Sequence, residues 1–190
     1  MNKSRLEAFS DGVMAVIITI MVLEMKAPHG PEVTDLLPLL PTFLTYVLSF
    51  IFLGIYWVNH HHFFQLVQKV SGGLLWANLH LLFWLSLVPF TTAWMGENHF
   101  ALWPVVTYGL NLVGCAIAYT FMTLAALSVH GPDSELAKAI GRDRKGKISL
   151  ALYIAAIPLA FLSPLISCAL FILVAFIWFV PDQRIERVIG

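Results

Sequence analysis

Charged residues are scarce in this chain. They make up 12% of the 190 residues, where soluble domains carry roughly 25%, and 59% of the residues are hydrophobic. This composition excludes a water-soluble domain and an intrinsically disordered chain. Lysine plus arginine and aspartate plus glutamate each number 11, so there is no basic surplus to neutralise phosphates. We therefore expect no nucleic-acid partner.

Cysteines and catalytic patterns are also few. Cys115 and Cys168 lie inside apolar runs, which predicts small buried side chains rather than a disulfide or metal framework. No Ser/His/Asp, His-x-x-Glu or paired-carboxylate pattern occurs at a catalytic spacing. The three consecutive histidines at positions 60–62 point about 100° apart on a helix, so they cannot all bind one metal ion. We predict a protein that is not an enzyme and needs neither a metal nor a cofactor.

The sequence is instead rich in apolar runs long enough to cross a membrane. At about 20 residues per crossing, they predict an all-α membrane protein with six transmembrane helices, which form one domain over residues 1–190. The predicted spans are residues 4–26, 42–67, 74–95, 100–129, 148–163 and 165–181. The last two spans are short, so a re-entrant or strongly kinked pair is the alternative for that part of the chain.

The connections between the spans carry helix-breaking residues. The first connection holds four prolines, which forbid a continuous helix there: Pro28, Pro31, Pro38 and Pro41. Residues 130–147 form the longest polar loop, in which a short surface helix can follow Ser134. Pro164 supplies the break between the last two spans.

Basic residues are unevenly distributed between the two sides of this six-span arrangement. One side has only Lys26, and the other has the remaining ten: Lys3, Arg5, Lys69, Lys138, Arg142, Arg144, Lys145, Lys147, Arg184 and Arg187. Because cytoplasmic loops carry the excess of positive charge, both termini are predicted to be cytoplasmic. As a separate expectation, the membrane is a bacterial inner membrane. The other side carries the acidic residues Glu24, Glu32, Asp35 and Glu97, and their negative charge favours cations there.

The first span has two different faces. At about 100° per residue, an apolar stripe with Thr19 at its edge contains Gly12, Val16, Ile20 and Leu23. Ser10, Asp11 and Met14 point to roughly the opposite side. A helix that simply packs or faces lipid would show the same stripe. If the stripe faces a pore, Asp11 faces neighbouring helices of its own subunit and holds the helix in position, since a carboxylate near hydrocarbon must be paired or hydrated.

These residues carry a family resemblance. Arg5-x-x-x-Phe9-Ser10-Asp11 resembles the R-x-x-x-F-S-D signature of the transmembrane protein 175 family, whose members are potassium-permeable channels. The resemblance continues in the second and third spans with the motifs Tyr56-Trp57-x-x-His60 and Trp76-Ala77-Asn78-Leu79. It therefore covers the first half of the chain, while the second half matches only in span count and apolar character. Six spans look like one repeat unit of that family, and bacterial members assemble such units as homotetramers around four first helices.

The resemblance implies a channel that is weakly selective for K⁺ over Na⁺ and has no carbonyl filter, because aliphatic side chains form its constriction. Carried onto this sequence, the constriction is Val16, Ile20 and Leu23, with Gly12 and Thr19 at the pore edge. The motifs assign the positioning of the first helix to Arg5, Phe9, Ser10 and Asp11, with candidate partners Trp57, His60, Asn78 and His80. The implied partners of the chain are three further copies of itself, membrane lipid and monovalent cations.

Other classes of membrane protein are the alternatives. A secondary transporter or a proton-permeable carrier usually has an ionisable group near the bilayer midplane, and the middle of every predicted span lacks Asp, Glu, Lys and Arg. A helper subunit of another membrane complex requires none of the features above. Reconstitution separates the three, because a channel gives stepwise single-molecule currents, a carrier gives coupled flux, and a helper gives neither.

Overall fold

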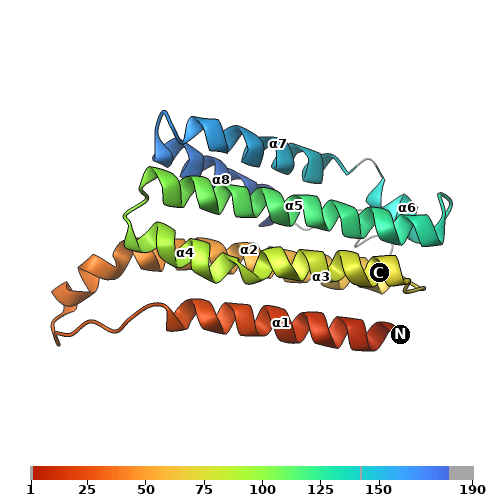
Figure 1. Cartoon of the computed structure of the whole chain (residues 1–190), viewed down its shortest axis with the longest axis horizontal. Helices are drawn as coiled ribbons and strands as arrows, with labels where there is room; N and C mark the ends of the chain where they lie inside the picture. Colours follow the sequence, from red (N-terminus) through yellow and green to blue (C-terminus); the bar gives the residue numbers. More distant parts are fainter. Residues whose placement is uncertain (1, 142, 180–190) are drawn as a thin grey trace.

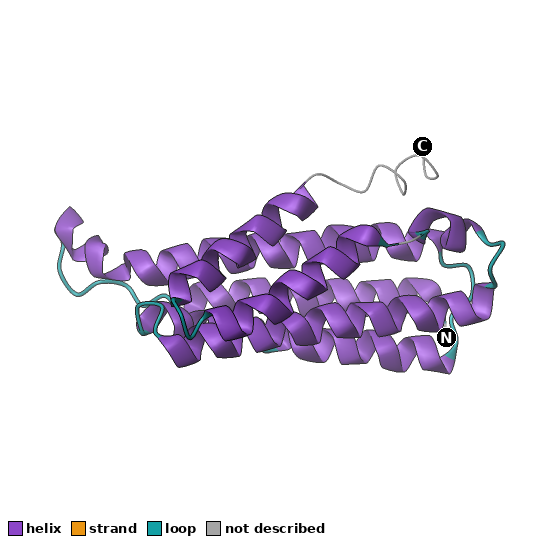
Figure 2. Cartoon of the chain, turned by 90° about the horizontal axis from the view of Figure 1, so that it is seen from above, coloured by secondary structure: helices purple, strands orange, loops and turns teal. Residues whose placement is uncertain are grey.

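The chain folds into a bundle of helices, seen in a computed structural model that describes residues 2–141 and 143–179. The main helices are α1 (Lys3–Leu23), α2 (Leu40–Leu66), α3 (Gly72–Ser86), α4 (Val88–Glu97), α5 (Leu102–His130), α7 (Arg144–Leu159) and α8 (Pro164–Phe179). Two short elements are the 3₁₀-helix η1 (Val33–Leu39) and α6 (Glu135–Ile140). Figure 1 shows α1 on one side of the bundle and α7 with α8 on the other, while Figure 2 shows α7 and α8 inclined to the remaining helices.

Some of the predicted features lie outside the described residues. They are the end of the last predicted span, residues 180 and 181, and three of the basic residues in the charge comparison, Arg142, Arg184 and Arg187.

Local side-chain chemistry fixes the limits of α5 and α6. The Ser134 hydroxyl accepts a hydrogen bond from the Ala137 N–H at 3.2 Å, the usual arrangement of a helix N-cap. The two helices end at Gly131 and Gly141, whose φ angles of 81° and 51° are readily adopted by a residue without Cβ. The short helix predicted after Ser134 is therefore present as α6.

The third predicted span is not one continuous helix. α3 ends at Ser86 and α4 begins at Val88, with Pro89 in the first turn of α4. Proline has no N–H for the carbonyl four residues earlier, and its ring crowds that carbonyl, so the helix is interrupted there. The two helices together still form a long apolar segment, Gly72–Glu97.

The first connection is more helical than its prolines predict. η1 contains Pro38 and runs directly into α2, whose first turn contains Pro41. Proline is tolerated in a first helical turn because the N–H there has no intrahelical partner. The prolines therefore shift the start of the regular helix and do not prevent one, and the apolar helical segment Val33–Leu66 has 34 residues.

Two apolar clusters hold the bundle together. One lies mainly among α1, α2, α3 and α5 and includes Met14, Phe64 and Met122. The other lies mainly among α2, α5, α7 and α8 and includes Tyr108 and Phe171. Because α2 and α5 contribute to both clusters, they form the centre of the bundle. α1 packs only on the first cluster, which leaves one long face of this helix uncovered.

The start of α1, the α2–α3 connection and the end of α5 meet at one end of the bundle. The Lys3 ammonium donates a hydrogen bond to the Gln65 carbonyl at 3.4 Å. The backbone N–H groups of Gln68 and Lys69 donate to Nε2 of His130 at 2.9 and 3.2 Å. Figure 1 shows α6 and the start of α7 at the same end, so most of the described basic residues gather there.

Candidate pore-lining helix

The apolar stripe of α1 is uncovered in the single subunit. Val16, Ile20 and Leu23 are 55%, 40% and 77% exposed. On the other side of the helix, Met14 and Ile17 are 1% and 3% exposed and pack in the first apolar cluster. The two faces follow the helical spacing of the sequence, so the exposed stripe is a property of how α1 packs on its own subunit.

The two residues expected at the pore edge also lie on exposed parts of α1. A Cβ built at Gly12 would meet no other atom within 4 Å, so this position opens to the outside of the subunit. Thr19 is exposed, and its hydroxyl donates a hydrogen bond to the Val16 carbonyl at 2.8 Å. Because that proton is used within the helix, only the lone pairs of the hydroxyl oxygen face outward.

A buried chain of hydrogen bonds ties α1 to α3 and α2. The Ser10 hydroxyl donates to the Leu6 carbonyl at 2.9 Å and accepts from the Asn78 amide at 3.0 Å. The other end of that amide, Oδ1 of Asn78, lies 2.8 Å from Nε2 of His60. Since the amide oxygen can only accept, the imidazole donates. All three polar side chains are at most 2% exposed, and each finds a partner, as buried polar groups require.

Asp11 makes a second connection, between α1 and α2. Its carboxylate accepts a hydrogen bond from the Trp57 indole N–H at 3.0 Å. The Trp57 ring stacks on His61, with ring centroids 6.0 Å apart. The histidines therefore do not contact Asp11 by hydrogen bonds, and His60 is occupied by Asn78. Asp11 remains exposed in the single subunit although it is bonded to its own bundle.

The other expected positioning residues lie away from these contacts. The side chain of Arg5 is exposed, and within residues 2–141 and 143–179 it makes no hydrogen bond or ion pair. Phe9 is also exposed, at 53%. His80 does not join α1 at all, because it accepts a hydrogen bond from Trp84 at 3.0 Å and stacks on Phe121 of α5.

A groove of about 560 Å³ runs between α1 and α4, and its α4 wall is not among the predicted site residues. On α1 it is lined by Val13, Val16, Ile17, Ile20 and Glu24, and on the facing helices by Ser86, Pro89, Phe90, Ala93, Trp94 and Glu97. The spacing of the second set is helical and could have indicated a common face. The groove brings together two of the acidic residues predicted on the same side of the membrane, Glu24 and Glu97.

Nothing in the described parts of the chain resembles a metal site. Groups of three or more His, Cys, Asp or Glu side chains that could hold an ion are absent there. The side chains of His60 and His61 are used in the contacts given above.

Comparisons with known proteins identify the class of protein to which this chain belongs. A family model described as the endosomal/lysosomal potassium channel TMEM175 matches residues 5–89. The structure resembles the crystal structure of a lysosomal potassium-selective channel TMEM175 homolog from Chamaesiphon minutus, with a TM-score of 0.82 and 31% identity over 95% of this chain and 97% of that one. A protein named as a potassium channel from Chryseobacterium sp. (strain P1-3) is 54% identical over 98% of this chain and 97% of its own length. The protein is thus an integral membrane protein of the ion-channel class and not an enzyme.

More distant relatives match a smaller part of the chain. The mouse protein named as an endosomal/lysosomal proton channel TMEM175 is 30% identical over 63% of this chain, which corresponds to 26% of the mouse protein. With a relative that matches over nearly its whole length and a solved structure of the same fold, the chain belongs to the TMEM175 family.

Proposed function

We propose that four copies of this chain surround a pathway for K⁺, lined by α1. The observation that carries the proposal is the exposed stripe of Val16, Ile20 and Leu23 on a helix whose opposite face is fixed by Ser10 and Asp11. Four such stripes facing one axis form successive aliphatic rings. The potassium-channel names of the relatives support K⁺ as the permeant ion.

The proposed topology has six crossings and both termini in the cytoplasm. Within the described residues, four helical segments are long and apolar enough to span a membrane, and α7 and α8 supply the other two crossings. α7 and α8 have 16 residues each, which is about 24 Å at 1.5 Å per residue and is shorter than a typical hydrocarbon core. A bilayer accommodates such a mismatch by thinning locally. The basic end of the bundle supports its cytoplasmic placement.

Selectivity in this arrangement is weak. An aliphatic ring offers no carbonyl oxygens to replace the hydration shell, so discrimination depends on how firmly each ion holds its water. K⁺ holds its water less firmly than Na⁺ and passes more easily. Val16 and Ile20 are one helical turn apart, about 6 Å along the axis, so the apolar barrier extends over more than one ring. Such a barrier closes the pathway by expelling water from it.

The test is a pair of asparagine substitutions on the same helix. Ile20 and Val22 are similarly exposed, at 40% and 43%, but they point about 160° apart on α1. Ile20→Asn is expected to wet the pathway and to increase both open probability and Na⁺ permeability in single-channel recordings. Val22→Asn is expected to leave both unchanged. Equal behaviour of the two variants would remove the stripe from the pathway.

Protons are the second candidate permeant ion, because the mouse relative is named as a proton channel. A wetted aliphatic barrier holds a chain of water molecules, which conducts protons without a titratable group. Liposomes that contain the protein and no K⁺ test this point with a pH-sensitive dye. A proton flux abolished by removal of the protein supports proton permeation, and a flux equal to that of empty liposomes contradicts it.

A further inference from the structure

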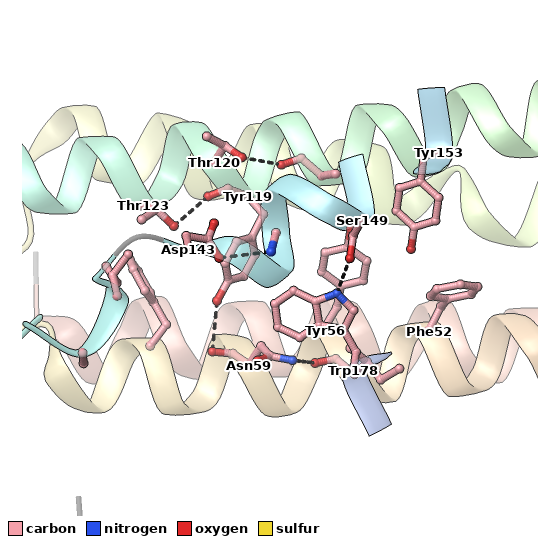
Figure 3. Close-up of a pocket in the computed structure, with 16 residues that line it drawn as sticks. Phe52, Tyr56, Asn59, Tyr119, Thr120, Thr123, Asp143, Ser149, Tyr153 and Trp178 are labelled. Carbon is pink, nitrogen blue, oxygen red and sulfur yellow. Dashed lines mark hydrogen bonds between the residues drawn. The ribbon is translucent and has the colours of Figure 1, made fainter. Parts of the chain in front are cut away.

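A second cavity lies among α2, α5, α6, α7 and α8, and none of its lining residues belongs to α1 (Figure 3). Its space is about 90 Å³. The walls are mainly aromatic, from Phe52, Tyr56, Phe63, Tyr119, Tyr153 and Trp178. The rings are closely associated, since the centroids of Tyr56 and Tyr119 and those of Phe52 and Tyr153 are each 6.2 Å apart.

Several polar groups in this cavity already make hydrogen bonds within the protein. The Asn59 amide and the hydroxyls of Thr120 and Thr123 donate hydrogen bonds to backbone carbonyls of their own helices, at 2.7 to 3.0 Å. Ser149 accepts from the Trp178 indole at 2.8 Å. No lysine, arginine or histidine is among the lining residues that the structure describes. Among these described lining residues, the one formal charge is therefore the carboxylate of Asp143.

Asp143 is held in an unusual position at the start of α7. Its φ of 38° is in the left-handed region, which aspartate tolerates better than most residues. One carboxylate oxygen, Oδ1, caps α7 by accepting from the Gly146 N–H at 3.1 Å. Within the described chain the other, Oδ2, has no hydrogen-bond donor. A Cβ at Gly146 would collide with this carboxylate, so the glycine leaves the room that it occupies.

We propose that this cavity binds a small organic ammonium ion, of the tertiary or quaternary type. The faces of aromatic rings attract such cations, and a set of rings is the usual receptor for a quaternary ammonium group. The same attraction already operates here from a side chain of the protein, because the Lys145 ammonium lies 5.9 Å from the centroid of the Trp178 ring. The neighbouring carboxylate of Asp143 supplies a negative charge that attracts such a cation.

The size of the cavity limits the ligand. An apolar cavity of about 150 Å³ accommodates benzene, so 90 Å³ suits a group of only a few heavy atoms. A trimethylammonium headgroup meets this condition, with the rest of the molecule outside the cavity. Such a headgroup has no N–H to donate, so aromatic side chains and one carboxylate are sufficient to hold it.

The experiment is calorimetric titration of the purified full-length channel with choline and with its uncharged carbon analogue, 3,3-dimethyl-1-butanol. Choline is expected to saturate one site per chain, and the neutral analogue to bind at least about tenfold more weakly. Asp143→Asn is expected to weaken choline binding about tenfold, while the helix cap is retained because asparagine caps as well as aspartate. The matched control is Asp133→Asn, an exposed aspartate of the same polar loop, which is expected to bind choline like the unsubstituted protein.

A second pair of variants tests the rings independently of the carboxylate. Trp178→Phe keeps an aromatic face and is expected to bind choline more tightly than Trp178→Leu, which keeps only apolar volume. Equal choline affinity in Asp143→Asn and the unsubstituted protein, equal binding of the neutral analogue, or the absence of saturable binding would each overturn the proposal. Choline held in the ion pathway would give the first of these results. None of the readouts depends on K⁺ conduction, so failure here is distinct from failure of the proposed channel.

Discussion

Replacement of Asn78 by leucine tests the buried contact that fixes α1. Leucine keeps the branched shape of asparagine but has a larger volume and lacks both polar halves of the amide. Ser10 then loses the hydrogen bond that it accepts at 3.0 Å, and His60 loses the oxygen at 2.8 Å to which it donates. Ser10 still donates to the Leu6 carbonyl, whereas the imidazole N–H of His60 is left buried without an acceptor.

The expected decrease in the free energy of unfolding follows from the loss of these two hydrogen bonds. A typical hydrogen bond contributes about 1 kcal/mol net, and a buried donor left without its partner costs about 1 to 3 kcal/mol. The first figure applies to the contact with Ser10 and the second to His60. We therefore expect Asn78→Leu to lower the free energy of unfolding by about 2 to 4 kcal/mol.

The assay is denaturant unfolding of the purified protein in detergent, followed by circular dichroism. Asn98→Leu is the matched control, because Asn98 is exposed and its amide donates only to the nearby Trp94 carbonyl. A double-mutant cycle with Ser10→Ala is expected to give a coupling of about 1 kcal/mol. If Asn78→Leu is as stable as Asn98→Leu, or if the Ser10 and Asn78 substitutions are strictly additive, the buried contact does not hold α1.

Further substitutions test packing with the same assay. Gly12→Ala is expected to leave stability unchanged or to raise it by up to about 1 kcal/mol, because the added Cβ meets no atom of the subunit and alanine favours a helix. Gly114→Ala is expected to destabilise by about 1 to 3 kcal/mol, because its Cβ would collide with the Trp84 indole; a neutral result would contradict this packing of α3 on α5. Tyr108→Phe removes a buried hydrogen bond of 3.0 Å to Ser49 and is expected to cost about 1 kcal/mol, and a stabilised variant would refute that role.

The sequence predicts elements better than it predicts contacts between them. The helix after Ser134 could be predicted because a cap and its helix are neighbours in the chain. The interruption before Pro89 was missed because an apolar run continues through it, and hydropathy does not detect a missing N–H. The helical start of the next segment is hidden for the opposite reason, because proline disfavours a helix interior but is tolerated in a first turn, where Pro41 of α2 lies.

The partners of individual side chains depend on how each helix is rotated against its neighbours. Spacing places Asp11 on a side of its own helix, but it does not say which residue of α2 faces it, and that residue is Trp57. For the same reason His80 was expected near α1, whereas its helix turns it toward α5. The aromatic cavity was also missed. One wall has the helical spacing of Phe52, Tyr56 and Phe63, but the residue with the charge, Asp143, comes from a distant part of the chain.

The attachment of α1 to its bundle is mechanically asymmetric. Its interhelical hydrogen bonds involve Lys3, Ser10 and Asp11, all in the first half of the helix. Farther along, Ile17 and Met21 contact the bundle through apolar side chains alone. Hydrogen bonds fix direction and distance, whereas dispersion contacts exchange neighbours at little cost. α1 is therefore held firmly in its first half and more loosely in its second half. Any tilting of the helix relative to its own bundle displaces Ser10 least and Leu23 most.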